Sequence, residues 1–185
     1  STLSGSGALQ TAFNNVPEGY VYAQTGGIAG SVADASIESC TVDFSGTMEI
    51  AEGGCMAILA GVGPMGLAAI NYAIHRKDRK PRLIVVTDID QSRLDRAASL
   101  YSPEEAAKNG IELKYVNTGA MADPTAELKA LTGGKGYNDV FVFAPVVPVV
   151  EQADAILAFD GCLNFFAGPA KTDFKAPFNF YNVHY

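Results

Sequence analysis

From Cys55 onward, short apolar runs alternate regularly with amphipathic stretches. This alternation is typical of a chain of βα units, which build a parallel sheet with helices on both faces. We therefore expect an α/β fold of the Rossmann type, a doubly wound parallel sheet of six strands in the order 3-2-1-4-5-6. The predicted strands are residues 55–60, 82–87, 111–116, 140–144, 162–166 and 178–185.

Local capping signals between these runs predict the helices. Asp90 can cap one helix, Ser102-Pro103-Glu104-Glu105 is a capping box with Asn109-Gly110 as its stop, and Asp123-Pro124 starts another helix. The predicted helices are residues 64–75, 91–101, 103–109, 124–133 and 148–158.

The first 52 residues carry no sustained period of 2 or 3.6, and several glycines interrupt them. We predict two parts, an N-terminal segment of residues 1–52, interpreted as a linker or a remnant of another domain, and a nucleotide-binding domain of residues 53–185.

The loop Gly61-Val62-Gly63-Pro64-Met65-Gly66 follows an apolar strand and opens a helix. In a G-x-G-x-x-G loop the first glycine is expected to permit the tight turn, the second to let the backbone approach a pyrophosphate, and the third to let the helix pack closely. Pro64 has no N–H, so the amides of Met65 and Gly66 are the predicted phosphate donors at the helix N-terminus. A purely structural glycine turn is the alternative.

Asp88 ends the second predicted strand, about 20 residues after the loop, where an acid can accept hydrogen bonds from ribose hydroxyls. Its charge would repel a 2′-phosphate, so NAD is favoured over NADP as the cofactor. Arg93 could reach the adenine or ribose, or could pair with Asp90 or Asp95 at the surface. The rest of the cofactor crevice is predicted at the ends of strands four and five, at Ala144, Pro145 and Gly168.

Composition narrows the possible partners. The 185 residues have a net charge of −7, which disfavours nucleic acid. Three cysteines without C-x-x-C spacing indicate neither a disulfide framework nor a zinc site, and a cytoplasmic location fits best. No signal peptide and no membrane-spanning run is evident. The basic run of residues 75–82 should be a solvated cap at the C-terminus of the first helix, and His75 belongs to it.

Several further segments resemble the zinc-type medium-chain alcohol and polyol dehydrogenases, and especially the members that act on sugar phosphates. The resemblance runs from about Gly53 to Tyr185 and includes the glycine loop, 85–90, 133–145 and 161–169. It implies hydride transfer between a nicotinamide and a carbon whose oxygen a catalytic zinc polarises. It also implies pyrophosphate contacts at Gly61, Gly63, Met65 and Gly66, a ribose contact at Asp88, and a homo-oligomer by analogy.

The family's zinc-ligating cysteine, its Gly-His-Glu motif and its four-cysteine lobe do not occur in this sequence. We therefore expect a fragment that binds the dinucleotide, with zinc and the sugar-phosphate or polyol substrate belonging to the full enzyme, and no catalytic residue is assigned. Glu38 resembles the family's inter-domain glutamate, although Ser39 replaces the proline after it, and an ordinary exposed carboxylate is the better interpretation. Two alternatives stay open: an S-adenosylmethionine-dependent methyltransferase, which needs an antiparallel last strand, and a non-catalytic NAD-sensing module.

Overall fold

The computed structural model describes residues 2–5, 41–44 and 50–180. The chain divides into two compact units, residues 1–48 and 49–185. In the first unit, strands β1 (Thr2–Gly5) and β2 (Thr41–Phe44) form a parallel pair. Glu38, Cys40 and His184 lie outside the described residues.

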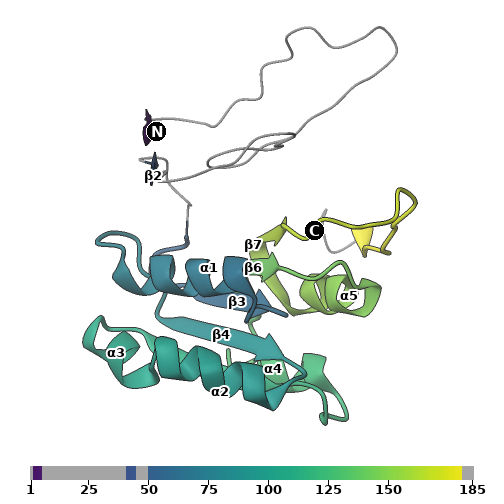
Figure 1. Cartoon of the computed structure of the whole chain (residues 1–185). Coiled ribbons are helices and arrows are strands. Elements are labelled where there is room, and N and C mark those ends of the chain that lie inside the picture. Colours follow the sequence, from purple (N-terminus) through teal and green to yellow (C-terminus); the bar gives the residue numbers. More distant parts are fainter. Residues whose placement is uncertain (1, 6–40, 45–49, 181–185) are drawn as a thin grey trace, which may run out of the picture. The chain divides into compact units, whose positions relative to one another are not determined.

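The second unit is built on a five-stranded sheet (Figure 1), and every pairing within it is parallel. In chain order its strands take the positions 3-2-1-4-5, as predicted, so β4 and β5 are added on one side of β3, and β6 and β7 on the other. The strands are β3 (Cys55–Leu59), β4 (Leu83–Asp88), β5 (Glu112–Asn117), β6 (Tyr137–Val142) and β7 (Leu157–Phe165).

The prediction of a sixth strand is wrong for the part that the structure describes. Residues 178–180 form no strand, and the remaining predicted residues lie outside the described ones. The backbone N–H of Asn179 donates to Asp154 Oδ2 at 3.0 Å, which holds this segment on a helix instead of on the sheet edge. Alternation of apolar residues alone did not distinguish the two arrangements.

Four helices begin at the predicted residue, and the fifth begins one residue earlier than predicted, at Val147. Asp90 accepts from the backbone N–H groups of Ser92 and Arg93, Ser102 accepts from Glu105 N at 3.2 Å, and Asp123 accepts from Ala126 N at 2.9 Å. Hydrogen bonds from the Ser92 hydroxyl and from the backbone amides of Arg93 and Ser92 hold the pKa of Asp90 below its usual value. The helices are α1 (Pro64–His75), α2 (Gln91–Leu100), α3 (Pro103–Lys108), α4 (Pro124–Ala130) and α5 (Val147–Ile156).

Side chains of the central strands alternate between two covered faces. Cys55, Ala57 and Leu59 belong to a core that includes residues of α4 and α5. Met56 and Ile58 alternate with them and are fully buried on the opposite face, which α1, α2 and α3 cover. Burial on both faces explains why these strands have continuous apolar sequences.

Strand β7 starts five residues earlier than predicted. Leu157 pairs with Tyr137, but the next pair is Asp139 with Cys162, so extra residues of β7 bulge from the ladder. Asp160 lies in this bulge with a φ of 56°. The bulge interrupts the apolar pattern, so only the regular part of the strand could be predicted.

The segment that leads into β3 is hydrogen-bonded to side chains at the start of β6. Ala51 N donates to Asp139 Oδ2 at 2.9 Å, and Cys55 N donates to Asn138 Oδ1 at 2.9 Å. Asp139 is only 5% exposed, and burial raises the pKa of its carboxyl group, although the Ala51 amide and Arg79 act in the opposite direction.

Replacing Asp139 with asparagine should stabilise the protein at neutral pH. A raised folded-state pKa means that the contribution of Asp139 is fully present below its unfolded pKa of about 3.9 and is lost as the pH rises through the folded value. Asparagine keeps an acceptor for Ala51 N without a charge. We expect the Tm of Asp139→Asn to exceed that of the wild type by about 2–4 °C at neutral pH, with the difference shrinking toward pH 4 or so.

Thermal unfolding followed from acid to neutral pH measures this difference. Asp95→Asn, which changes an exposed aspartate of α2, is the matched control and should leave the pH profile unchanged. A lower Tm for Asp139→Asn at neutral pH would show that the fold prefers the ionised carboxylate.

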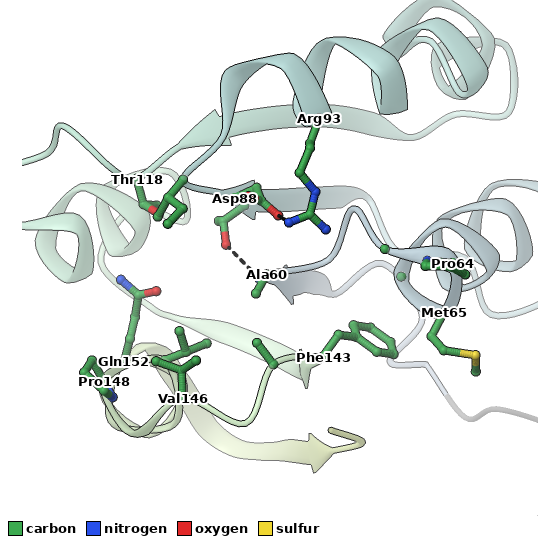
Figure 2. Close-up of a pocket in the computed structure, with 16 residues that line it drawn as sticks. Ala60, Pro64, Met65, Asp88, Arg93, Thr118, Phe143, Val146, Pro148 and Gln152 are labelled. Atoms are coloured by element: carbon green, nitrogen blue, oxygen red, sulfur yellow. Dashed lines mark hydrogen bonds and ion pairs between the residues drawn. The ribbon is translucent and has the colours of Figure 1, made fainter. Parts of the chain in front are cut away.

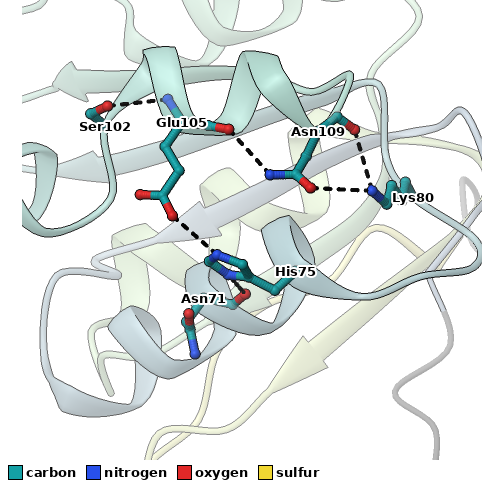
Figure 3. Close-up of polar contacts among 6 residues, drawn as sticks. All are labelled: Asn71, His75, Lys80, Ser102, Glu105 and Asn109. Carbon is teal, nitrogen blue, oxygen red and sulfur yellow. Dashed lines mark hydrogen bonds and ion pairs between the residues drawn. The ribbon is translucent and has the colours of Figure 1, made fainter.

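The basic run at the end of α1 is more structured than the predicted solvated cap (Figure 3). The two ring nitrogens of His75 lie within hydrogen-bond distance of Asn71 O, at 2.9 Å, and of Glu105 Oε1, at 3.1 Å. Glu105 therefore links α3 to α1. Arg76 is not solvated, because its side chain is 4% exposed and lies 5.3 Å from the centre of the Tyr72 ring.

Candidate functional site

A cavity of about 550 Å³ lies where the strands of the sheet end (Figure 2). In parallel α/β sheets, ligands bind in such a crevice at the carboxyl ends of the strands, next to the point where the strand order reverses. The lining comes from the ends of β3, β4, β5 and β6, from the first turns of α1 and α2, and from the first two turns of α5. It consists of Ala60, Gly63, Pro64, Met65, Gly66, Thr87, Asp88, Ile89, Arg93, Thr118, Phe143, Ala144, Val146, Pro148, Val149 and Gln152.

The N-terminus of α1 faces this cavity without a side-chain cap. Its N-cap residue is Gly63, Pro64 stands at the first helical position, and its first turn holds no acidic residue. Side chains of Asp90, Ser102 and Asp123 cap α2, α3 and α4, so α1 differs from them. Uncapped N–H groups and the positive end of the helix dipole favour an anion here.

The three loop glycines have different tasks from each other, and one differs from the prediction. The positive φ that turns the chain out of β3 belongs to Ala60, at 50°, and not to Gly61. A Cβ on Gly61 would instead overlap the Ile58 side chain, so glycine is required there for space. A Cβ on Gly66 would overlap the backbone of Gly61, which agrees with the predicted close packing of the helix.

At Gly63 the missing Cβ leaves open space on the cavity side. A Cβ built there would have Arg93 Nη2 as its nearest neighbour, at 3.9 Å. The backbone is therefore accessible to a ligand, as a dinucleotide pyrophosphate requires, and the structure fits the cofactor at this point.

Asp88 is the acidic group of the cavity. Its side chain is 4% exposed, and its Oδ2 lies 3.6 Å from Arg93 Nη1, whose side chain is 51% exposed. Asp90 N donates to Asp88 Oδ1 at 3.1 Å, and Thr118 N donates to its carbonyl oxygen at 3.0 Å. Arg93 therefore pairs with Asp88, not with Asp90 or Asp95 as the surface interpretation required, and it helps to orient the carboxylate.

The cavity includes most of the predicted cofactor residues but not all of them. Gly63, Pro64, Met65, Gly66, Asp88, Arg93 and Ala144 line it, whereas Gly61, Pro145 and Gly168 do not. Gly61 is buried beneath the loop, and Gly168 is exposed beyond β7. Sequence reasoning missed Thr118 and Gln152. The position of Thr118 just after a predicted strand was a usable signal, but nothing in the sequence pointed to Gln152.

The N-terminus of α5 also lacks a side-chain cap, and it meets the same cavity. Its N-cap residue is Val146, and Val146, Pro148, Val149 and Gln152 all line the cavity. This side is apolar apart from Gln152, so it offers a surface for a flat ring.

The described residues hold neither a metal-binding cluster nor a membrane-spanning helix. In these residues, no group of three or more His, Cys, Asp or Glu side chains could hold a metal ion. Residues 50–180 therefore contain no ligand set for a catalytic zinc. No described helix is long and apolar enough to cross a membrane.

Comparisons with known proteins agree with this geometry. The family model of zinc-binding dehydrogenases matches residues 64–185. Mannitol-1-phosphate 5-dehydrogenase of Aliivibrio fischeri is 56% identical over 82% of the chain, and L-sorbose 1-phosphate reductase of Klebsiella pneumoniae is 43% identical over 77%. The predicted likeness to sugar-phosphate enzymes therefore holds, with the mannitol enzyme more similar than the sorbose one.

The chain spans about a third of the length of these relatives, 36% and 33% respectively. Among solved structures, benzyl alcohol dehydrogenase of Acinetobacter calcoaceticus is 20% identical with a TM-score of 0.57, over 74% of this chain and 33% of its own. At that identity the likeness supports the fold alone. In the described part of the second unit the sheet is fully parallel. It therefore lacks the antiparallel strand that the methyltransferase alternative requires.

Proposed function

The chain belongs to the family of zinc-binding dehydrogenases, and we propose that its second unit binds NAD(H) for hydride transfer to or from a sugar phosphate or polyol. The observation that carries this proposal is the cavity in which the uncapped N-terminus of α1 lies across from the buried carboxylate of Asp88. Pyrophosphate needs the first feature and a ribose diol needs the second.

In this proposal Met65 N and Gly66 N donate to the pyrophosphate, and Gly63 lets it approach. Asp88 accepts hydrogen bonds from both ribose hydroxyls, while Arg93 orients its carboxylate. The bound nicotinamide supplies or accepts the hydride. Ala144, at the end of β6, lies along the path toward it, and the chain's described residues contribute binding and orientation to the reaction.

The substrate class rests on the two relatives named for phosphorylated C6 compounds, mannitol 1-phosphate and sorbose 1-phosphate. The zinc and the substrate contacts would come from parts of the enzyme beyond the described residues. Combining the chain with such a catalytic part and finding turnover of a ketose phosphate would exclude the non-catalytic sensing module.

Asp88→Ala is the direct test of the cofactor site. Losing two hydrogen bonds to a charged acceptor should weaken NADH binding at least about 100-fold, since each contributes about 1.5–3 kcal/mol. Titration with NADH, followed by the change in its fluorescence, measures the Kd. The wild type should bind NADH more tightly than NADPH, because a 2′-phosphate would meet the Asp88 carboxylate.

The matched control is Asp95→Ala, which removes an exposed aspartate from the same helix as Arg93 and should leave the Kd unchanged. Saturable NADH binding that Asp88→Ala leaves intact would place the ribose elsewhere and overturn the site.

A further inference from the structure

The cavity has two ends, and the proposed cofactor fills them in a fixed order. The N-terminus of α1 lies at one end, with Asp88 in the middle (Figure 2). If phosphate binds at α1 and ribose at Asp88, the adenine base must continue to the end farther from α1. This step rests on the proposed function.

That far end is apolar on its walls. Ile89 follows β4, and Val146 and Val149 belong to the start of α5; all three line the cavity. Ile89 is 75% exposed, which is unusual for so large an apolar side chain beside a core strand. A flat base between these residues would cover them.

Gln152 supplies the polar group at this end. It is half-buried on the second turn of α5, and its amide points into the cavity on the side of Thr118 (Figure 2). Gln91, at the start of α2, lines neither hollow and forms hydrogen bonds with Asp95 and Asn117. The Gln152 amide thus stays available for a ligand.

A second hollow of about 430 Å³ adjoins the first and shares Thr118, Pro148, Val149 and Gln152 with it. It adds Thr125 and Glu151 and opens to the surface between α4 and α5. Gln152 therefore stands at the boundary between the two hollows.

We propose that Gln152 recognises the edge of the adenine ring and makes the site selective for an adenine dinucleotide. A glutamine amide carries one donor and one acceptor side by side. Adenine presents the complementary pair, the N6 amino group as donor and an adjacent ring nitrogen as acceptor, which glutamine pairs with in a bidentate manner. Gln152 would act on binding, with no contact to the reacting carbon.

The experiment compares NADH with its 1,N6-etheno analogue, in which the N6 donor is lost and the ring edge is blocked. The wild-type chain should bind NADH about 10-fold or more tightly than the analogue, the factor that one bidentate pair contributes. Gln152→Leu has similar size and no polar atom. It should weaken NADH binding by the same factor, leave the Kd of the analogue nearly unchanged, and so abolish the preference.

Glu151→Gln is the matched control, because Glu151 neighbours Gln152 but lines only the outer hollow. It should retain the preference, and unchanged thermal unfolding would show that each variant is folded. If Gln152→Leu keeps the full preference for NADH while Asp88→Ala loses binding, the adenine proposal fails and the cofactor site stands. If the wild type binds neither dinucleotide, the proposed function itself fails.

Discussion

Gly63→Val is expected to abolish measurable NADH binding while the protein remains folded. The backbone at Gly63 has φ −79° and ψ 176°, which any residue adopts, so valine causes no strain. Its side chain would fill the open space between the loop and Arg93, where the pyrophosphate is proposed to approach. We expect the Kd for NADH to rise more than about 100-fold, with Gly63→Ala intermediate, because a displaced phosphate loses its charge-assisted hydrogen bonds.

Titration with NADH and thermal unfolding, measured on the same samples, separate binding from folding. Ala107→Val also creates a valine, here on the exposed side of α3 away from the cavity, and serves as the control. Wild-type affinity in Gly63→Val would mean that the ligand does not approach this part of the backbone.

Gly66→Ala should have the opposite profile, a large loss of stability. Glycine to alanine within a helix normally stabilises by about 1 kcal/mol. At Gly66 the added Cβ would overlap the backbone of Gly61, which cannot move aside as a flexible side chain could. The N-terminus of α1 must shift away from the loop, so we expect the free energy of unfolding to fall by at least about 2 kcal/mol.

Denaturant unfolding measures this loss. Ala68→Gly, at an exposed position of the same helix, isolates the effect of helix propensity and should cost about 1 kcal/mol. Gly66→Ala adds a methyl group to the helix and Ala68→Gly removes one, so helix propensity alone would make their effects opposite in sign. Destabilisation by both substitutions would show that the added Cβ at Gly66 overlaps the loop. An increase in stability for Gly66→Ala would contradict the close packing of α1 on the loop.

Much of the second unit could be predicted from the sequence, because its signals are local. Continuous apolar runs mark strands buried on both faces, and the caps at Asp90, Ser102 and Asp123 mark helix starts. The glycine loop and Asp88 could likewise be proposed from local sequence, since strand, loop and helix follow one another directly.

The rest depends on contacts between residues far apart in the sequence. Spacing could not show that Ala60, and not Gly61, takes the positive φ. It could not show that Asp154 holds the segment of the supposed sixth strand, nor that Glu105 pairs with His75 across two helices. Gln152 looks like any polar residue of an amphipathic helix until α5 is placed beside the cavity.

The ion pair between Asp88 and Arg93 has an evolutionary consequence. If a mutation removed the carboxylate, the guanidinium would stay at the ribose position without its ion-pair partner. The repulsion of a 2′-phosphate would disappear and an attraction would replace it in the same step. The cofactor preference that we propose is therefore separated from its reversal by a single amino-acid change, because the residue needed for the other preference is already present.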